Sequence, residues 1–134
     1  MFGRFFKRSE PEEVFVEGEI DRMADDAPPH VQALHMILEQ SLVDQAYEVL
    51  LQHDRFRNEF AVYFKRNDAY EEVLRPPASL FSPMLTMLAY AANLRLPEDH
   101  GQFLFPRETG GRLRYSIAVE DNAQTMALSM IGYI

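Results

Sequence analysis

The sequence contains no cysteine and no tryptophan. The missing cysteine excludes disulfide cross-links, iron–sulfur clusters, cysteine-ligated zinc and thiol nucleophiles. No run of about 18 consecutive apolar residues is present, so no segment is long enough to span a bilayer as a helix. Basic residues are scarce as well, because 13 Lys and Arg stand against 21 Asp and Glu for a net charge of −8. This acidity argues against nucleic-acid binding, which depends on Lys and Arg.

Motifs that carry enzyme chemistry are also missing. No serine lies in a GxSxG nucleophile elbow, and Gly110-Gly111 is followed by Arg112 rather than by the Lys-Ser/Thr of a phosphate-binding loop. No dinucleotide-binding fingerprint and no HExxH pair of metal ligands occurs. We therefore predict no catalytic residue and no cofactor, and we expect the protein not to be an enzyme.

The charges are unevenly placed along the 134 residues. Residues 1–8 carry three bases and no acid, whereas residues 9–26 carry eight acids and one base. This pattern predicts a charged N-terminal extension over 1–26, followed by one globular domain over 27–134, a length that suits a single core. Because no apolar stretch follows the basic start, we expect no secretory signal peptide and a cytoplasmic protein.

The spacing of the apolar residues predicts an α+β domain. Apolar residues three and four apart predict three helices, over 30–53, 55–75 and 82–94. A change to period-two alternation then predicts a small antiparallel β unit over 102–134. The last segment, 125–134, also fits helical spacing, so an all-α bundle with a C-terminal helix is the alternative.

Aromatic residues are the feature that points most directly to a function. Ten Phe and six Tyr make up 12% of the chain, and seven Met add adaptable apolar surface. We predict a non-catalytic adaptor, chaperone or inhibitor that binds another protein through acidic and aromatic surface. Small acidic secretion chaperones and immunity proteins are similar to it in size and charge. The candidate binding residues are Phe2, Phe5 and Phe6 as a docking arm, with Phe56, Tyr63 and Tyr70 as a groove.

Several alternatives stay open on the sequence alone. The aromatic residues of 56–70 also suit a hydrophobic core, and residues 1–8 also suit folding back on the domain or a weak contact with a membrane surface. His35 and Glu39 lie four residues apart and, with His53, would supply metal ligands for a small metal-dependent or acid–base hydrolase. The remaining alternative is a structural homo-oligomer.

Overall fold

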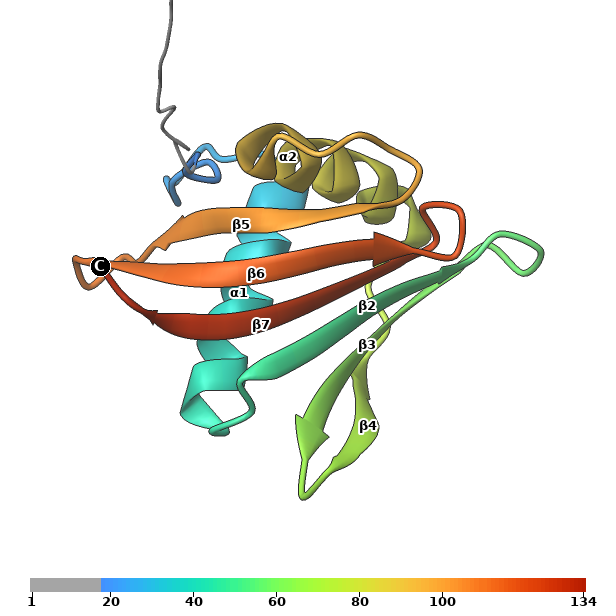
Figure 1. Cartoon of the computed structure of the whole chain (residues 1–134), viewed down its shortest axis with the longest axis horizontal. Helices are drawn as coiled ribbons and strands as arrows, with labels where there is room; N and C mark the ends of the chain where they lie inside the picture. The colour runs from blue at the N-terminus through green and yellow to red at the C-terminus, as the bar shows by residue number, and fades with distance from the viewer. Residues whose placement is uncertain (1–17) are drawn as a thin grey trace, which may run out of the picture.

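Helices and antiparallel hairpins alternate in the computed structural model, which describes residues 18–134 (Figure 1). Each of its two α-helices, α1 (Pro29–Val43) and α2 (Phe81–Ala92), is followed by three strands, and a short 3-10 helix, η1 (Ala78–Leu80), leads into α2. The strands are β2 (Glu48–Asp54), β3 (Glu59–Arg66), β4 (Ala69–Leu74), β5 (Asp99–Pro106), β6 (Arg112–Glu120) and β7 (Thr125–Tyr133).

All six strands form one antiparallel sheet in the order β4-β3-β2-β7-β6-β5. The two halves of the sheet join where β2 pairs with β7, with Val49 opposite Leu128. Figure 1 looks onto the sheet, with α1 passing behind it and α2 packed near β5. No helix of residues 18–134 covers the opposite face of the sheet, which we call the open face.

The hydrophobic core lies between the two helices and the sheet. Alternate residues of a strand point to opposite faces, so every second residue of each strand reaches this core. In β6, Tyr115 and Ile117 are buried in the core, whereas the intervening Ser116 lies on the open face. The largest side chains of the helices that are less than 2% exposed are Leu34, Ile37, Leu38, Met84 and Leu88.

The predicted order of three helices followed by a small β unit is wrong, and so is the all-α alternative. The first helix ends at Val43 instead of reaching residue 53, and residues 55–75 contain the whole of β3 and β4 instead of a helix. The chain turns back after β2 at Asn58 and after β3 at Asn67, with φ angles of 54° and 52°. Asn adopts this left-handed conformation more readily than most residues, and each turn ends a strand. The α+β character expected from the sequence is nevertheless present.

Residues 18–20 run parallel to the outer edge of β5. The Ile20 amide donates to the Leu104 carbonyl at 3.0 Å, and the Leu104 amide donates to the Gly18 carbonyl at 2.9 Å. Ile20 is 1% exposed and belongs to the core. Gly18 fits closely against the end of α2, because an added Cβ would lie 2.5 Å from the Ala91 carbonyl oxygen. This contact covers part of the β5 edge of the sheet.

Candidate functional site

Polar and aromatic side chains share the β4–β3–β2 half of the open face. Tyr70 of β4 lies opposite Lys65 of β3, and its hydroxyl donates to Glu48 Oε1 of β2 at 3.4 Å. Lys65 Nζ lies 3.6 Å from the same carboxylate oxygen and 5.8 Å from the centre of the Tyr70 ring. Partial burial and the negative charge of Glu48 raise the pKa of Tyr70. Tyr70 is therefore a neutral hydrogen-bond donor at neutral pH.

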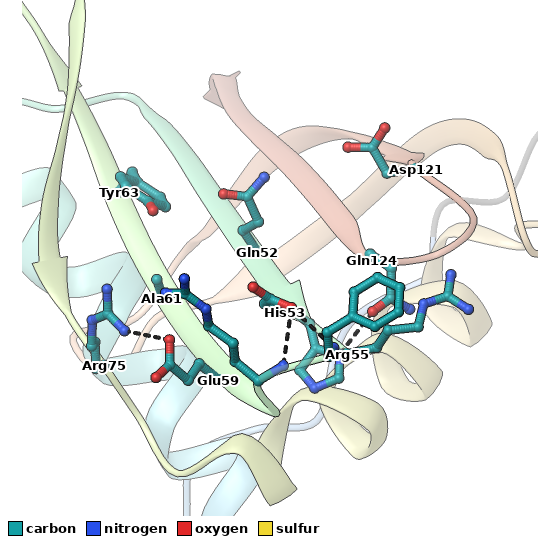
Figure 2. A pocket seen from close by; sticks show the side chains of 12 residues that line it. Gln52, His53, Arg55, Glu59, Ala61, Tyr63, Arg75, Asp121 and Gln124 are labelled. Atoms are coloured by element: carbon teal, nitrogen blue, oxygen red, sulfur yellow. Dashed lines mark hydrogen bonds and ion pairs between the residues drawn. The ribbon is translucent and has the colours of Figure 1, made fainter.

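A cleft opens at the end of this face, beside the β2–β3 turn and the start of β7 (Figure 2). Its volume is about 520 Å³. Gln52 and Ala61 face each other across the β2–β3 ladder, and the small Ala61 side chain leaves room next to Tyr63. The cleft is lined by Gln52, His53, Asp54, Arg55, Phe56, Arg57, Glu59, Ala61, Tyr63, Arg75, Asp121 and Gln124.

The β2–β3 turn presents an exposed phenylalanine on a fixed backbone. Asp54 Oδ1 accepts hydrogen bonds from the amides of Phe56 and Arg57, at 3.0 and 3.2 Å. Such side-chain to backbone bonds satisfy amides that a turn leaves without ladder partners. Phe56 is 95% exposed, more than any other large hydrophobic side chain in residues 18–134. Burying a side chain of this size against an apolar surface is worth about 1.5–3 kcal/mol.

His53 holds this turn against the rest of the domain. Its ring stacks on Phe81 of α2, with centroids 5.1 Å apart. Its Nδ1 lies 2.9 Å from Gln124 Oε1, and its Nε2 lies 3.3 Å from Asn58 Oδ1. Because both ring nitrogens and one ring face are engaged, His53 positions the wall of the cleft.

An ion-pair network fixes the side of the cleft formed by the chain that follows β4. Arg75 Nη1 lies 2.9 Å from Glu59 Oε1, and Arg75 Nε lies 2.7 Å from Glu72 Oε2; Figure 2 marks the pair with Glu59. The two carboxylates raise the pKa of Arg75, and the hydrogen bond from Arg75 lowers the pKa of Glu72. Arg75 and Glu72 therefore stay charged at neutral pH, and the guanidinium of Arg75 is directed at the carboxylates of Glu59 and Glu72.

A second hollow of about 820 Å³ lies over the β5–β6–β7 half of the open face. Its floor is made of small side chains that face each other in register, Ser116 opposite Ser129 and Ala118 opposite Ala127. His100 of β5 also lines this hollow. The open face thus has a hollow floored by small side chains in one half and an aromatic cleft at the end of the other half.

Two of the residues predicted as a groove lie together. Phe56 and Tyr63 line the same cleft, and Tyr70 lies on the same face outside that lining. Their role in binding stays a prediction. The predicted docking arm lies outside the described residues: Phe2, Phe5 and Phe6.

The residues considered as metal ligands occupy different surroundings. His35 is buried in α1, where its Nε2 lies 2.7 Å from the Asp21 carbonyl oxygen. Glu39 accepts two hydrogen bonds from Arg107, at 2.7 and 3.2 Å. His53 lies at the far end of β2 with its nitrogens engaged as described above. Within residues 18–134, no three His, Cys, Asp or Glu side chains form a group that could hold a metal ion.

Sequence reasoning missed several residues that shape the cleft, above all Gln52, Arg55 and Gln124. The signal that could have found them is period-two alternation on both sides of the segment from Asp54 to Asn58, because that combination is typical of a hairpin. The helical spacing of the apolar residues in the same segment predicts a helix instead of this hairpin.

Neither a protein-family model nor a curated protein matches the chain. In residues 18–134, neither α-helix has both the length and the apolar character required to cross a membrane.

Proposed function

We propose that this protein is a non-catalytic interaction module, an adaptor, chaperone or inhibitor, that binds another protein on the open face of its sheet. The observation that carries the proposal is the cleft in which the exposed Phe56 and the half-buried Tyr63 lie together at the end of that face. Aromatic side chains at the centre of an interface contribute a large share of the binding free energy. Tyrosine is well suited to this role, because it adds a hydroxyl to a large and rigid ring.

The partner contacts the face of the sheet in this proposal, because both edges are protected. Residues 18–20 already pair with part of the outer edge of β5. The other edge strand, β4, carries Glu71 and Glu72 and departs from regular pairing beside Val62. Charged side chains and bulges on an edge strand oppose the addition of a further strand.

The charge of the chain favours a partner that carries basic side chains. The net charge of the chain is −8. Opposite charges on two proteins speed their association, and salt weakens this effect. We therefore expect the association rate to fall as ionic strength rises.

Affinity capture with the full chain tests this proposal. A Tyr63→Ala/Tyr70→Ala variant removes two aromatic side chains of the open face and should recover at least about tenfold less of the partner from the native source, the result of losing about 1.4 kcal/mol of binding free energy. Tyr90→Ala is the matched control, because Tyr90 is 90% exposed on α2. Circular dichroism and thermal unfolding verify that both variants are folded. Equal recovery by the two variants would contradict the proposal.

A further inference from the structure

We infer that residues 13–17 of this chain cover the hollow over β5–β6–β7, with the ring of Phe15 lying on its floor of small side chains. These five residues, Glu-Val-Phe-Val-Glu, directly precede the described part of the chain. The inference assigns one half of the open face to the chain itself and leaves the cleft beside Phe56 for a partner. It goes beyond the proposed function and does not rest on it.

The described part of the chain begins at the rim of the hollow. The Gly18 amide donates to the Ala91 carbonyl at 3.0 Å, and the Gly18 carbonyl accepts the Leu104 amide at 2.9 Å. The next residue of α2 and Gln102 of β5 both line the hollow. Three residues of chain span at most about 10 Å. Phe15 is therefore held within that distance of Gly18, beside the hollow.

The pairing of residues 18–20 with β5 fixes which side chains of the segment face the open side of the sheet. Ile20 points into the core and is 1% exposed. Glu19 points to the opposite side, where its carboxylate lies 3.6 Å from Arg112 of β6. Alternate residues of an extended chain point to opposite faces. Phe15 and Glu17 therefore fall on the open face with Glu19, and the two valines fall on the side of Ile20.

The same register places Phe15 over the floor of the hollow. Glu19 forms a parallel bridge with Leu104 of β5. Counting back four residues along both strands sets Phe15 beside His100, whose partner in β6 is Ala118. The next side chain across the sheet, in β7, is an alanine as well. Side chains this small leave room above the sheet for an aromatic ring.

The charges of the segment match those of the hollow. On β6, which runs antiparallel to the segment, Arg114 follows Arg112 on the open face and lines the hollow. Glu17 precedes Glu19 by the same two residues, so it is placed to face Arg114. Among the described residues that line the hollow, Asp99 is the one acid, and its two carboxylate oxygens each accept a backbone amide at 2.8 Å. The acid of the segment thus meets an arginine.

A tethered occupant has an advantage over a free one. The run Val14-Phe15-Val16 is apolar and typical of a strand, and burying its phenylalanine is worth about 1.5–3 kcal/mol. A short tether gives such a segment an effective concentration in the millimolar range, on the order of 1 mM. This concentration favours the chain's own segment over another protein as the occupant of the hollow.

Cysteine labelling of the full chain tests the inference, because the chain has no cysteine of its own. Ala118→Cys places one thiol on the floor of the hollow, and its rate of alkylation by iodoacetamide reports whether the floor is covered. Adding Phe15→Ser should speed this labelling at least about tenfold, the effect of uncovering a thiol that is covered for about nine-tenths of the time. Equal rates with and without Phe15→Ser would overturn the inference.

Matched variants separate covering of the hollow from a general change in the protein. Phe56→Ser removes an exposed phenylalanine from the other half of the face and should leave the labelling rate of Ala118→Cys unchanged. Ser82→Cys, exposed on α2, should react at one rate with and without Phe15→Ser. Ser116→Cys, a nearly isosteric change on the same floor, replaces Ala118→Cys if circular dichroism shows that the latter is unfolded. If Phe56→Ser speeds the labelling as much as Phe15→Ser does, the inference is wrong.

Other occupants of the hollow would give different results. If protection of the floor thiol rises with protein concentration and ignores Phe15→Ser, the occupant is a second copy of the chain. If protection requires addition of a lysate from the native source, another protein covers the floor. Either result would overturn the inference. The proposed function is tested separately, because Phe15→Ser leaves Tyr63 and Tyr70 in place.

Discussion

The imidazole of His53 lies flat against the ring of Phe81, with centroids 5.1 Å apart and planes inclined by 21°. This contact joins the end of β2 to the first residue of α2. Gln124 and Asn58 engage the two ring nitrogens, so the β2–β3 and β6–β7 turns meet at the same side chain. The shape of the cleft therefore depends on one partly buried ring that belongs to the framework of the domain.

Replacing His53 should destabilise the fold as well as the cleft. His53→Ala removes the stack and two polar contacts, and we expect the free energy of unfolding to fall by about 2–3 kcal/mol. Chemical denaturation measures this change. His100→Ala is the control, because His100 is exposed on β5 and should cost less than about 0.5 kcal/mol. Equal losses in the two variants would show that His53 does not have this positioning role.

The hydroxyl of Tyr115 is buried without a hydrogen-bond partner among the described residues. Tyr115→Phe removes a polar group that has lost its hydration, so the free energy of unfolding should stay unchanged or rise by about 1 kcal/mol. Thermal or urea unfolding at neutral pH measures it. A loss of more than about 1 kcal/mol would indicate that the hydroxyl has a partner.

The same side chain should make the fold sensitive to alkaline pH. Burial raises the pKa of Tyr115 above its ordinary value of 10.0. Above that pH the unfolded chain has released this proton and the folded chain has kept it, so the free energy of unfolding falls as pH rises. Tyr115→Phe should remove this contribution, whereas Tyr90→Phe, at a 90% exposed position, should leave it in place. Superimposable alkaline profiles of native protein and Tyr115→Phe would contradict this account.

Gly18 should tolerate no side chain where residues 18–20 meet the end of α2. An added Cβ would lie 2.5 Å from the Ala91 carbonyl oxygen, which also accepts the Gly18 amide. We expect Gly18→Ala to lower the free energy of unfolding by about 1–3 kcal/mol, because backbone atoms must move apart. Gly132→Ala is the matched control, because a Cβ there meets nothing within 4 Å. If both variants are equally stable, the contact is looser than described.

The predicted docking arm has its own test. Deletion of residues 1–8 removes Phe2, Phe5 and Phe6 together with three basic residues. If the arm contributes to binding, the truncated chain should recover about tenfold less partner than the full chain in the capture experiment. Unchanged recovery would remove the arm from the account and leave the open face as the binding surface.

The sequence predicted the second half of the fold better than the first half. In residues 112–119, apolar and polar residues alternate strictly, and β6 occupies almost the same range. Pro29 begins α1 and Ser82-Pro83 marks the first turn of α2, so both helix starts were visible in the sequence. The local sequence was sufficient to predict β6 and the two helix starts, because each of these segments fits only one type of secondary structure.

The first half was misread because its apolar residues fit two periods at once. Phe60 and Phe64 are four apart, which suits a helix, but Phe60, Val62 and Phe64 also alternate, and they are the residues that face the core. The deciding signals were the turn residues Asn58 and Asn67, whose positive φ angles reverse the chain. The helices α1 and α2 bury the core face of the sheet, and this burial favours the strand over the helix. No local sequence pattern reveals that burial.

The candidate site was visible in the sequence only as a cluster of aromatic residues. That cluster includes Phe56 and Tyr63, but whether the two residues lie together in space depends on the pairing of β2 with β3. Gln124 joins the cleft from the turn that precedes β7, through a contact with His53 across 71 positions in the chain. Such a long-range arrangement follows from strand order and not from spacing.

Site-specific photocrosslinking in the native source tests the central claim most directly, because it reports which surface touches the partner. A benzophenone amino acid is placed at position 63 in the cleft and, in a separate chain, at position 90 on α2. The account predicts a crosslink to one protein from position 63 and no such crosslink from position 90. A crosslink to that protein from position 90 with none from position 63 would contradict the claim that the open face is the binding surface.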